Sequence, residues 1–295
     1  WGREVEKRKT DLQIKKFDDA VRAKDFDTVY AVGGELVRKF PENVNFMLPM
    51  AMIGLPESYR KNYKYNDESL KHAKMALAKL KSGTAEPKKD KDGKPRTDPN
   101  GKPLFGPFQF ERNAENAISE LAYGLGYILY YAKNEKRAGL LYLYEASQLP
   151  GMYRTEPLIF STIGDYYTAE SGPIGKEIAS LIERQKAATT DEEKVKLEAE
   201  IKSRVGMYNG YKDRALDAFG RAYRFADERI ASEKALRTQL FTKLSALSGV
   251  AAKDRLDKIV AAAAERPFPD PTSAVAPIDD PETVAEPPSP SPSTV

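Results

Sequence analysis

Apolar residues recur at every third or fourth position through most of the chain, and charged residues fill the positions between them. The pattern begins with Leu12, Ile14, Phe17 and Val21, which share one face of a helix expected over residues 5–24. A period of about 3.6 residues is that of an amphipathic α-helix, because side chains three or four positions apart lie on the same face. The sequence therefore predicts a protein built from amphipathic helices.

Proline, glycine and asparagine divide this pattern into helices that follow one another in pairs. Pro41 and Asn43 end the second helix and Gly249 ends a later one, because a residue before proline leaves the helical region and glycine favours the left-handed conformation after a helix. The predicted fold class is all-α. The helices are expected over residues 5–24, 25–40, 44–55, 67–80, 108–132, 135–148, from Pro157 onward, 228–248 and 252–264.

Two local features modify this outline. Gly33 and Gly34 stand in the middle of the second helix, where they predict either a close approach of a neighbouring helix or a kink. Pro56 begins a stretch rich in tyrosine and asparagine that continues to Asn66. We expect a loop there, because proline interrupts a helix interior.

Two further segments interrupt the succession of pairs. Residues 83–107 are polar and contain two Gly-Lys-Pro tripeptides behind Asp-Gly and Asn-Gly, which predict a short hairpin or a mobile loop. Residues 171–209 are amphipathic, with Thr190 and Glu193 spaced as a capping box. A projecting helical-hairpin insertion is expected from this second segment.

Charge separates the end of the chain from the rest. The chain carries 47 Lys and Arg against 44 Asp and Glu, a net charge of +3, but no basic residue follows Arg266. Nine of the 20 prolines fall in residues 267–295. Such a segment buries too little apolar surface to fold, so we expect a helical domain over residues 1–266 and a Pro-rich acidic tail over 267–295 that is extended or disordered.

Composition removes most routes to catalysis. There is no cysteine and a single histidine, His72, which stands near Lys71 and Lys74 and is expected at the surface. No phosphate-binding loop, dinucleotide fingerprint, zinc spacing or serine elbow occurs. We therefore expect a protein that is not an enzyme and has no metal and no cofactor. Charges alternate in sign along nearly every helix, so nucleic-acid binding is not expected either.

One segment carries a recognisable motif. Between residues 119 and 150, five residues fall at the spacing of one helix-turn-helix repeat: Leu125, Gly126, Ala138, Tyr142 and Pro150. The segment resembles a tetratricopeptide repeat. Partial matches occur at Ser69, Ala73 and Ala76, and again at Gly164, Ala215 and Phe219. The resemblance implies a right-handed superhelix of antiparallel helix pairs, an α-solenoid, that binds a protein or peptide partner in its concave groove.

The resemblance also places a row of tyrosines in that groove. Tyr123, Tyr127, Tyr130 and Tyr131 form one stripe on their helix, and Glu120 falls on the same positions of the family's register. A phenol ring offers apolar area with a polar tip and loses little entropy on binding. These five residues are the candidate partner-binding residues. The alternative is that the stripe packs against neighbouring helices as core.

The sequence favours a non-enzymatic interaction scaffold of a bacterium. Trp1 with Arg3, Lys7 and Arg8 is a combination that often flanks the end of a membrane span, so we expect anchoring through a segment before Trp1 and a place at the membrane or in the cell envelope. The alternatives are a plain solvated helix start and the cytoplasm. A second hypothesis for the function is a structural subunit that self-associates into an oligomer or fibre through its end helices.

Overall fold

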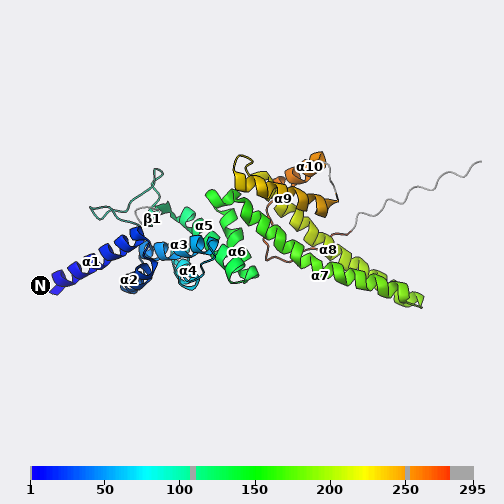
Figure 1. Ribbon diagram of the computed structural model, residues 1–295, viewed down its shortest axis with the longest axis horizontal. Helices are drawn as coiled ribbons and strands as arrows, with labels where there is room; N and C mark the ends of the chain where they lie inside the picture. The colour runs from blue at the N-terminus through cyan, green and yellow to red at the C-terminus, as the bar shows by residue number, and fades with distance from the viewer. Residues whose placement is uncertain (1, 107–110, 250–252, 280–295) are drawn as a thin grey trace, which may run out of the picture. The chain divides into compact units, whose positions relative to one another are not determined.

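The computed structural model describes residues 2–106, 111–249 and 253–279 of the 295-residue chain (Figure 1). Within these residues most of the regular structure is α-helix, and helices pack against their neighbours in sequence. Contacts divide the chain into two compact units: residues 1–159 with 270–272, and residues 160–269 with 273–295. Each unit has its own helices and its own core. Trp1 and residues 280–295, for which an interfacial position and an extended or disordered tail are predicted, lie outside the described residues.

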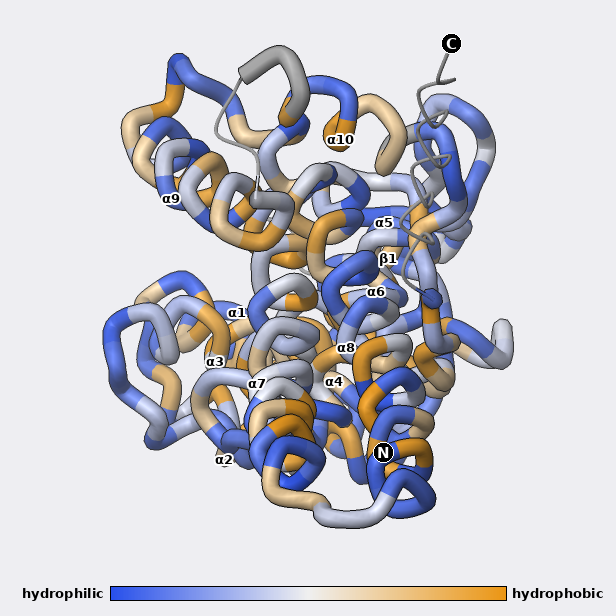
Figure 2. Tube along the Cα trace, turned by 90° about the vertical axis from the view of Figure 1, so that its right-hand side faces the viewer, coloured by the Kyte–Doolittle hydropathy of each residue, from blue (hydrophilic) through white to orange (hydrophobic). Residues whose placement is uncertain are grey.

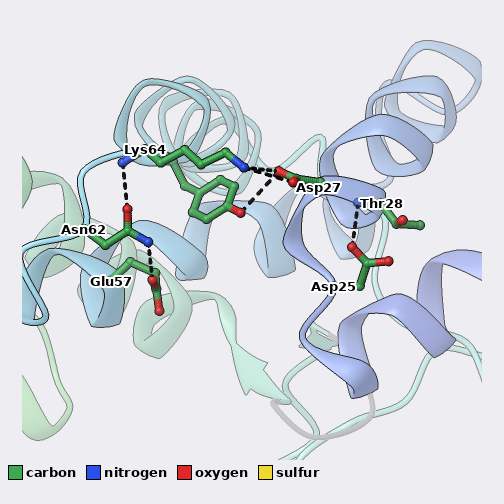
Figure 3. Close-up of polar contacts among 7 residues, drawn as sticks. Asp25, Asp27, Thr28, Glu57, Asn62 and Lys64 are labelled. Carbon is green, nitrogen blue, oxygen red and sulfur yellow. Dashed lines mark hydrogen bonds and ion pairs between the residues drawn. The ribbon is translucent and has the colours of Figure 1, made fainter.

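Three helix pairs make up the first unit, as the periodicity predicts. Asp25 begins the second helix, because its side chain accepts a hydrogen bond from the Thr28 amide at 3.2 Å (Figure 3). Apolar and polar residues alternate in short blocks along most helices (Figure 2). The first unit contains α1 (Gly2–Ala23), α2 (Phe26–Lys39), α3 (Val44–Tyr59), α4 (Asn66–Ser82), α5 (Ala114–Tyr127), a π-helix (Ile128–Ala132) and α6 (Lys136–Gln148).

Two predicted boundaries in this unit are wrong. α3 continues through Pro56 and ends at Tyr59, where Lys61 adopts a left-handed conformation with φ 62°. Most residues of α3 are buried, and this packing outweighs the local cost of proline. α5 begins at Ala114, because Arg112 and Asn113, which the prediction placed in this helix, pair with β1 instead; the predicted residues 108–110 lie outside the described residues.

The polar segment before α5 forms a hairpin structure. β1 (Leu104–Phe105) pairs antiparallel with β2 (Arg112–Asn113). Two tight turns precede β1, and each is closed by an aspartate. The Asp90 carboxylate accepts from the amides of residues 92 and 94 at 2.8 and 2.9 Å, and the Asp98 carboxylate accepts from those of residues 100 and 102 at 2.9 Å each. The repeated Gly-Lys-Pro tripeptides therefore mark two copies of one turn.

Glycines set the close approaches between helices of the first unit. A Cβ atom on Gly33 would lie 2.7 Å from the Met50 sulfur and from the Phe17 ring. One on Gly126 would lie 2.7 Å from Leu143 Cγ. Gly33 therefore marks a close approach, one of the two readings of the glycine pair, and α5 and α6 touch at the glycine of the repeat motif.

The second unit is built on a long helical hairpin. Gly164 and Gly175 on α7 face Phe219 and Tyr208 on α8, so the two helices run antiparallel. Both are continuous, and the predicted helical-hairpin insertion at 171–209 is the outer part of this one hairpin. The described helices of this unit are α7 (Pro157–Ala187, from residue 160), α8 (Asp191–Phe225), α9 (Ala231–Ser248) and α10 (Lys253–Glu265).

The chain leaves α10 as an extended segment. Phe268 is buried against Phe160, at 5.0 Å between ring centroids, and residues 273–278 lie along α8. None of the helices in the described part of the chain combines the length and apolar character needed to cross a membrane.

Candidate partner-binding site

Six tyrosines from four elements of the first unit form one continuous cluster. Four of them are the predicted groove residues on α5 and the π-helix, the fifth ends α3, and the sixth lies on a 3₁₀-helix (Met152–Thr155). We call this set the tyrosine cluster: Tyr59, Tyr123, Tyr127, Tyr130, Tyr131 and Tyr153. Each ring lies within 6.4 Å of at least one other, between centroids.

Tyr123 is the base of the cluster. Its side chain is 4% exposed, its ring stacks on Tyr153 at 4.2 Å, and its hydroxyl lies 3.0 Å from the hydroxyl of Tyr59. Burial raises the pKa of Tyr123 far above its usual value, and the neighbouring hydroxyl of Tyr59 raises it further. Tyr123 therefore stays neutral and fixes the positions of the outer rings.

The outer rings face solvent. Tyr59 is 50% exposed and Tyr131 46% exposed, and the half-buried Tyr127 lies between them, 4.6 Å from the first ring and 4.7 Å from the second. Burial raises the pKa of both Tyr59 and Tyr127. Neutral hydroxyls beside exposed ring faces can donate and accept hydrogen bonds while the rings contact apolar groups.

The π-helix carries the last two rings of the stripe. Gly139 of α6 approaches so closely that its Cβ would lie 2.8 Å from the backbone nitrogen of Tyr130. Tyr130 packs there, with the Lys136 ammonium 6.0 Å from its ring centroid, and Tyr131 is left at the surface. Single π-turns occur often at functional sites, and here one separates a packed ring from an exposed one.

Glu120 lies beneath the cluster. It is 5% exposed, and the Arg112 side chain donates to its carboxylate at 2.6 Å. Burial raises the pKa of the Glu120 carboxyl, and Arg112 opposes that shift. A partner at the surface meets Arg112 before it meets Glu120, so the glutamate can act on a partner only by positioning the arginine.

The structure thus brings the five predicted residues into one region, with different exposures. Sequence reasoning missed Tyr59 and Tyr153 as members. Tyr59 stood in a segment expected to be a loop, and Tyr153 follows the proline that ends the repeat motif. For Tyr59, the aromatic residues that follow Pro56 were the available signal. No local feature of the sequence marks Tyr153.

An apolar pocket of about 280 Å³ opens between α1, α2 and α3. Its floor is aliphatic and aromatic, and charged groups stand at its edge. The lining residues include Val21, Phe26, Met52, Pro56 and Ile53, with Lys24, Glu57 and Arg60. No motif pointed to this pocket, because its walls come from three helices.

Hydrogen bonds hold the loop beside this pocket. Glu57 accepts from Arg60 and from Asn62, each at 2.6 Å, and Lys64 donates to Asp27 of α2 at 2.8 Å (Figure 3). Both bonds to Glu57 lower the pKa of its carboxyl, the bond from Asn62 more than that from Arg60. These bonds fix Glu57 and Arg60 at the edge of the pocket.

His72 does not lie at the surface as predicted. It is 3% exposed, with Nε2 3.3 Å from the Glu68 carboxylate, and burial lowers its pKa. Within the described residues, no three His, Asp or Glu side chains are grouped to hold a metal ion.

No family model, curated protein or solved structure matches this chain. The surface chemistry of the tyrosine cluster and of the pocket is therefore what indicates a function.

Proposed function

We propose that this protein is a non-enzymatic interaction module that binds a segment of a partner protein at the tyrosine cluster. The pairs of the first unit would belong to a right-handed, tetratricopeptide-like superhelix, with the cluster on its inner face. Two features support this arrangement: sequential helices pack in pairs, and Gly126 and Gly164 sit at close contacts where that family keeps small residues.

The observation that carries the proposal is the combination of exposed and buried phenols. Tyr59 and Tyr131 are large, rigid and about half exposed, and Tyr123 beneath them is buried and neutral. Aromatic residues fixed in this way lose little conformational entropy on binding and are enriched among the residues that dominate interfaces. An adaptable or charged surface would lack this property.

The pocket between α1 and α3 gives the same unit a second contact. An aliphatic side chain of the partner fits its floor, and the Lys24 cation at its edge favours a neighbouring carboxylate, whereas Arg60 there is paired with Glu57. We therefore expect the bound segment to contain an apolar residue next to an acidic one.

The test replaces the two outer rings of the stripe. In Tyr127→Ala/Tyr131→Ala the partner loses its aromatic contacts, and we expect binding to weaken at least about 100-fold, as for a pair of interface hot spots. The partner is identified first, by purifying the native protein from its own cells with mass spectrometry of what accompanies it. Its affinity for the variant is then measured by calorimetry.

Leu141→Ala is the matched control. Leu141 is 48% exposed on α6 and is not part of the cluster, so its removal should leave binding unchanged. Helix content is checked by circular dichroism for both variants. Binding retained by a folded Tyr127→Ala/Tyr131→Ala variant would overturn the proposal.

A second candidate, self-association into an oligomer or fibre, is favoured by α1. Leu12 is 68% exposed on this helix, whose buried residues are Phe17 and Ala20. A helix with an open apolar position can pair with another copy. Sedimentation at increasing concentration would show mass growth that Leu12→Glu abolishes; a mass constant for the wild type excludes this candidate.

A further inference from the structure

One face of α8 carries an extended stretch of the same chain. Gly206, Gly210 and Arg214 lie one turn apart on α8 and contact residues 273–278. We call the three residues the glycine face. The hydrogen bonds are Arg214 Nη1 to Ser273 Oγ (2.9 Å), Arg214 Nη2 to the Ala274 carbonyl (2.8 Å), the Ile278 amide to the Gly206 carbonyl (2.9 Å) and Asn209 Nδ2 to the Ile278 carbonyl (3.3 Å).

The two glycines make room for a backbone. A Cβ on Gly210 would collide with the Ala276 carbonyl oxygen and lie 2.9 Å from Val275 Cγ1. A Cβ on Gly206 would lie 3.3 Å from Pro277 Cβ. Any larger residue at position 210 would push the segment off the helix, so this part of α8 is shaped for a chain lying directly upon it.

The spacing of helix and segment matches. Four helical residues rise about 6 Å, and two residues of an extended, polyproline-like chain span about the same length. Contacts repeat in that ratio: Ala274 with Arg214, Ala276 with Gly210, and Ile278 with Gly206. The face therefore contacts main-chain groups at a regular interval, which a segment with small side chains presents when a proline keeps it extended, and which a flexible Gly-Ser chain does not.

Arg214 is held in place for this contact. Its Nη1 donates to the hydroxyl of Tyr167 at 3.1 Å, and the guanidinium lies 5.7 Å from the ring centroid of that residue. Tyr167 is 1% exposed, so it is a fixed support. A donor held by its surroundings binds a carbonyl with less loss of entropy than a mobile one.

The segment itself is held weakly. Ala274, Ala276 and Pro277 are exposed, Ile278 is 43% exposed, and Val275 is half-buried. Because little apolar surface is buried, the segment is attached mainly by hydrogen bonds of its backbone. Segments of this kind open locally at a small fraction of the free energy of global unfolding.

We propose that the glycine face of α8 is a peptide-binding site for extended segments that combine small residues with a proline. Residues 273–278 are its ligand within the chain, and their release opens the site to a segment of the same chemistry from another molecule. The site belongs to the second unit and shares no residue with the tyrosine cluster. A test of this site is therefore independent of the proposed function.

The test uses the full chain with residues 273–278 replaced by a Gly-Ser linker of equal length, which empties the face. A blocked fluorescent peptide of residues 272–279 is titrated onto it. We expect saturable binding at least about tenfold tighter than to the wild type, where the tethered segment competes at a high effective concentration.

Gly210→Ala in the linker-replaced chain should reduce binding at least about tenfold, whereas Gly172→Ala should not, since a Cβ at position 172 meets nothing within 4 Å. Both changes favour the helix equally, so helix stability does not separate them. In the otherwise wild-type chain, Gly210→Ala should accelerate hydrogen exchange at the Ile278 amide.

A folded linker-replaced chain that does not bind the peptide, or equal binding by Gly210→Ala, would overturn the proposal. Dimers of the wild type that vanish on linker replacement would support it, with a second copy supplying the segment.

Discussion

The single histidine ties the stability of the first unit to pH. His72 is packed against Glu68 with its ring 6.3 Å from that of Tyr30, and within the described residues its Nδ1 has no hydrogen-bond partner. Burial, and secondarily the Lys71 charge, lower its pKa from the ordinary 6.5. The His72 imidazole therefore binds a proton less readily in the folded chain than in the unfolded chain.

The sign of the pH dependence follows from that difference. Below about pH 6.5 the unfolded state binds more protons than the folded state, so the free energy of unfolding falls as pH falls. We expect His72→Gln to remove part of the loss between about pH 7 and about pH 5. Urea unfolding of the wild type and the variant over that range measures the free energy of unfolding at each pH. The same pH dependence in both proteins would show that His72 does not cause the loss.

At the residue scale, the sequence predicts which tyrosines share one face of the helix but not how far each of them is buried. Tyr123 and Tyr131 have the same helical pattern around them, yet one is buried by Tyr59 and Tyr153 and the other is exposed. The burial of His72 could not be predicted for the same reason. The lysines beside it in the sequence indicate a surface position, but Tyr30, which packs near its ring, lies on another helix. Contacts from distant parts of the chain leave no local signal.

Among the elements, two glycines mark the positions where paired helices touch. A Cβ at Gly126 would lie 2.8 Å from the Leu143 backbone nitrogen, and one at Gly164 would lie 2.5 Å from the Phe219 ring. The Leu143 backbone cannot shift as a flexible side chain can, and the Phe219 ring is 1% exposed and has no room to move. We expect Gly126→Ala and Gly164→Ala each to lower the free energy of unfolding by about 1–3 kcal/mol, the usual cost of overpacking.

Gly124→Ala is the control for this prediction. It lies on α5 beside Gly126, and a Cβ there meets nothing within 4 Å. The substitution should stabilise the protein by about 0.5–1 kcal/mol through helix propensity alone. Denaturant unfolding compares the three variants, and equal effects at positions 124 and 126 would show that the helices do not touch at the motif glycine.

The order of the helices and most of their positions could be predicted because periodicity and capping residues are local, whereas α7 and α8 are each continuous where a separate hairpin insertion was expected. Asp25 and Thr190 begin helices as their side chains predict, by accepting from the amides of Thr28 and Glu193. The end of α3 and the start of α5 could not, since burial of α3 and pairing of β1 with β2 decide them. The continuity of α7 through Pro173 depends likewise on its packing against α8.

At the scale of the whole molecule, contacts group the chain into two compact units, each with buried apolar residues of its own. Leu36, Met47 and Met50 are fully buried in the first unit, and Phe219 and Leu240 are buried in the second. Each core is assembled from helices close in sequence. The single helical domain predicted over residues 1–266 stays a prediction, since the helices of one repeat domain also contact mainly their neighbours in sequence.

Hydrogen exchange can tell whether the two cores open separately. Gly126→Ala should lower the opening free energy of amides in α5 and α6 by at least about 1 kcal/mol, with a smaller change in α8 and α9. Gly164→Ala should do the reverse. Equal changes throughout the chain in both variants would mean that the two units unfold as one cooperative body.

A photo-crosslinking benzophenone side chain at position 131 of the full chain, within its own cells, tests whether a partner protein binds at the tyrosine cluster. Position 141 receives the same side chain as a control, because Tyr131 and Leu141 are about equally exposed, at 46% and 48%. Binding at the tyrosine cluster predicts a covalent adduct with one partner protein from position 131 and none from 141. Adducts from position 141, or none from position 131 while the partner still purifies with the protein, would contradict the account.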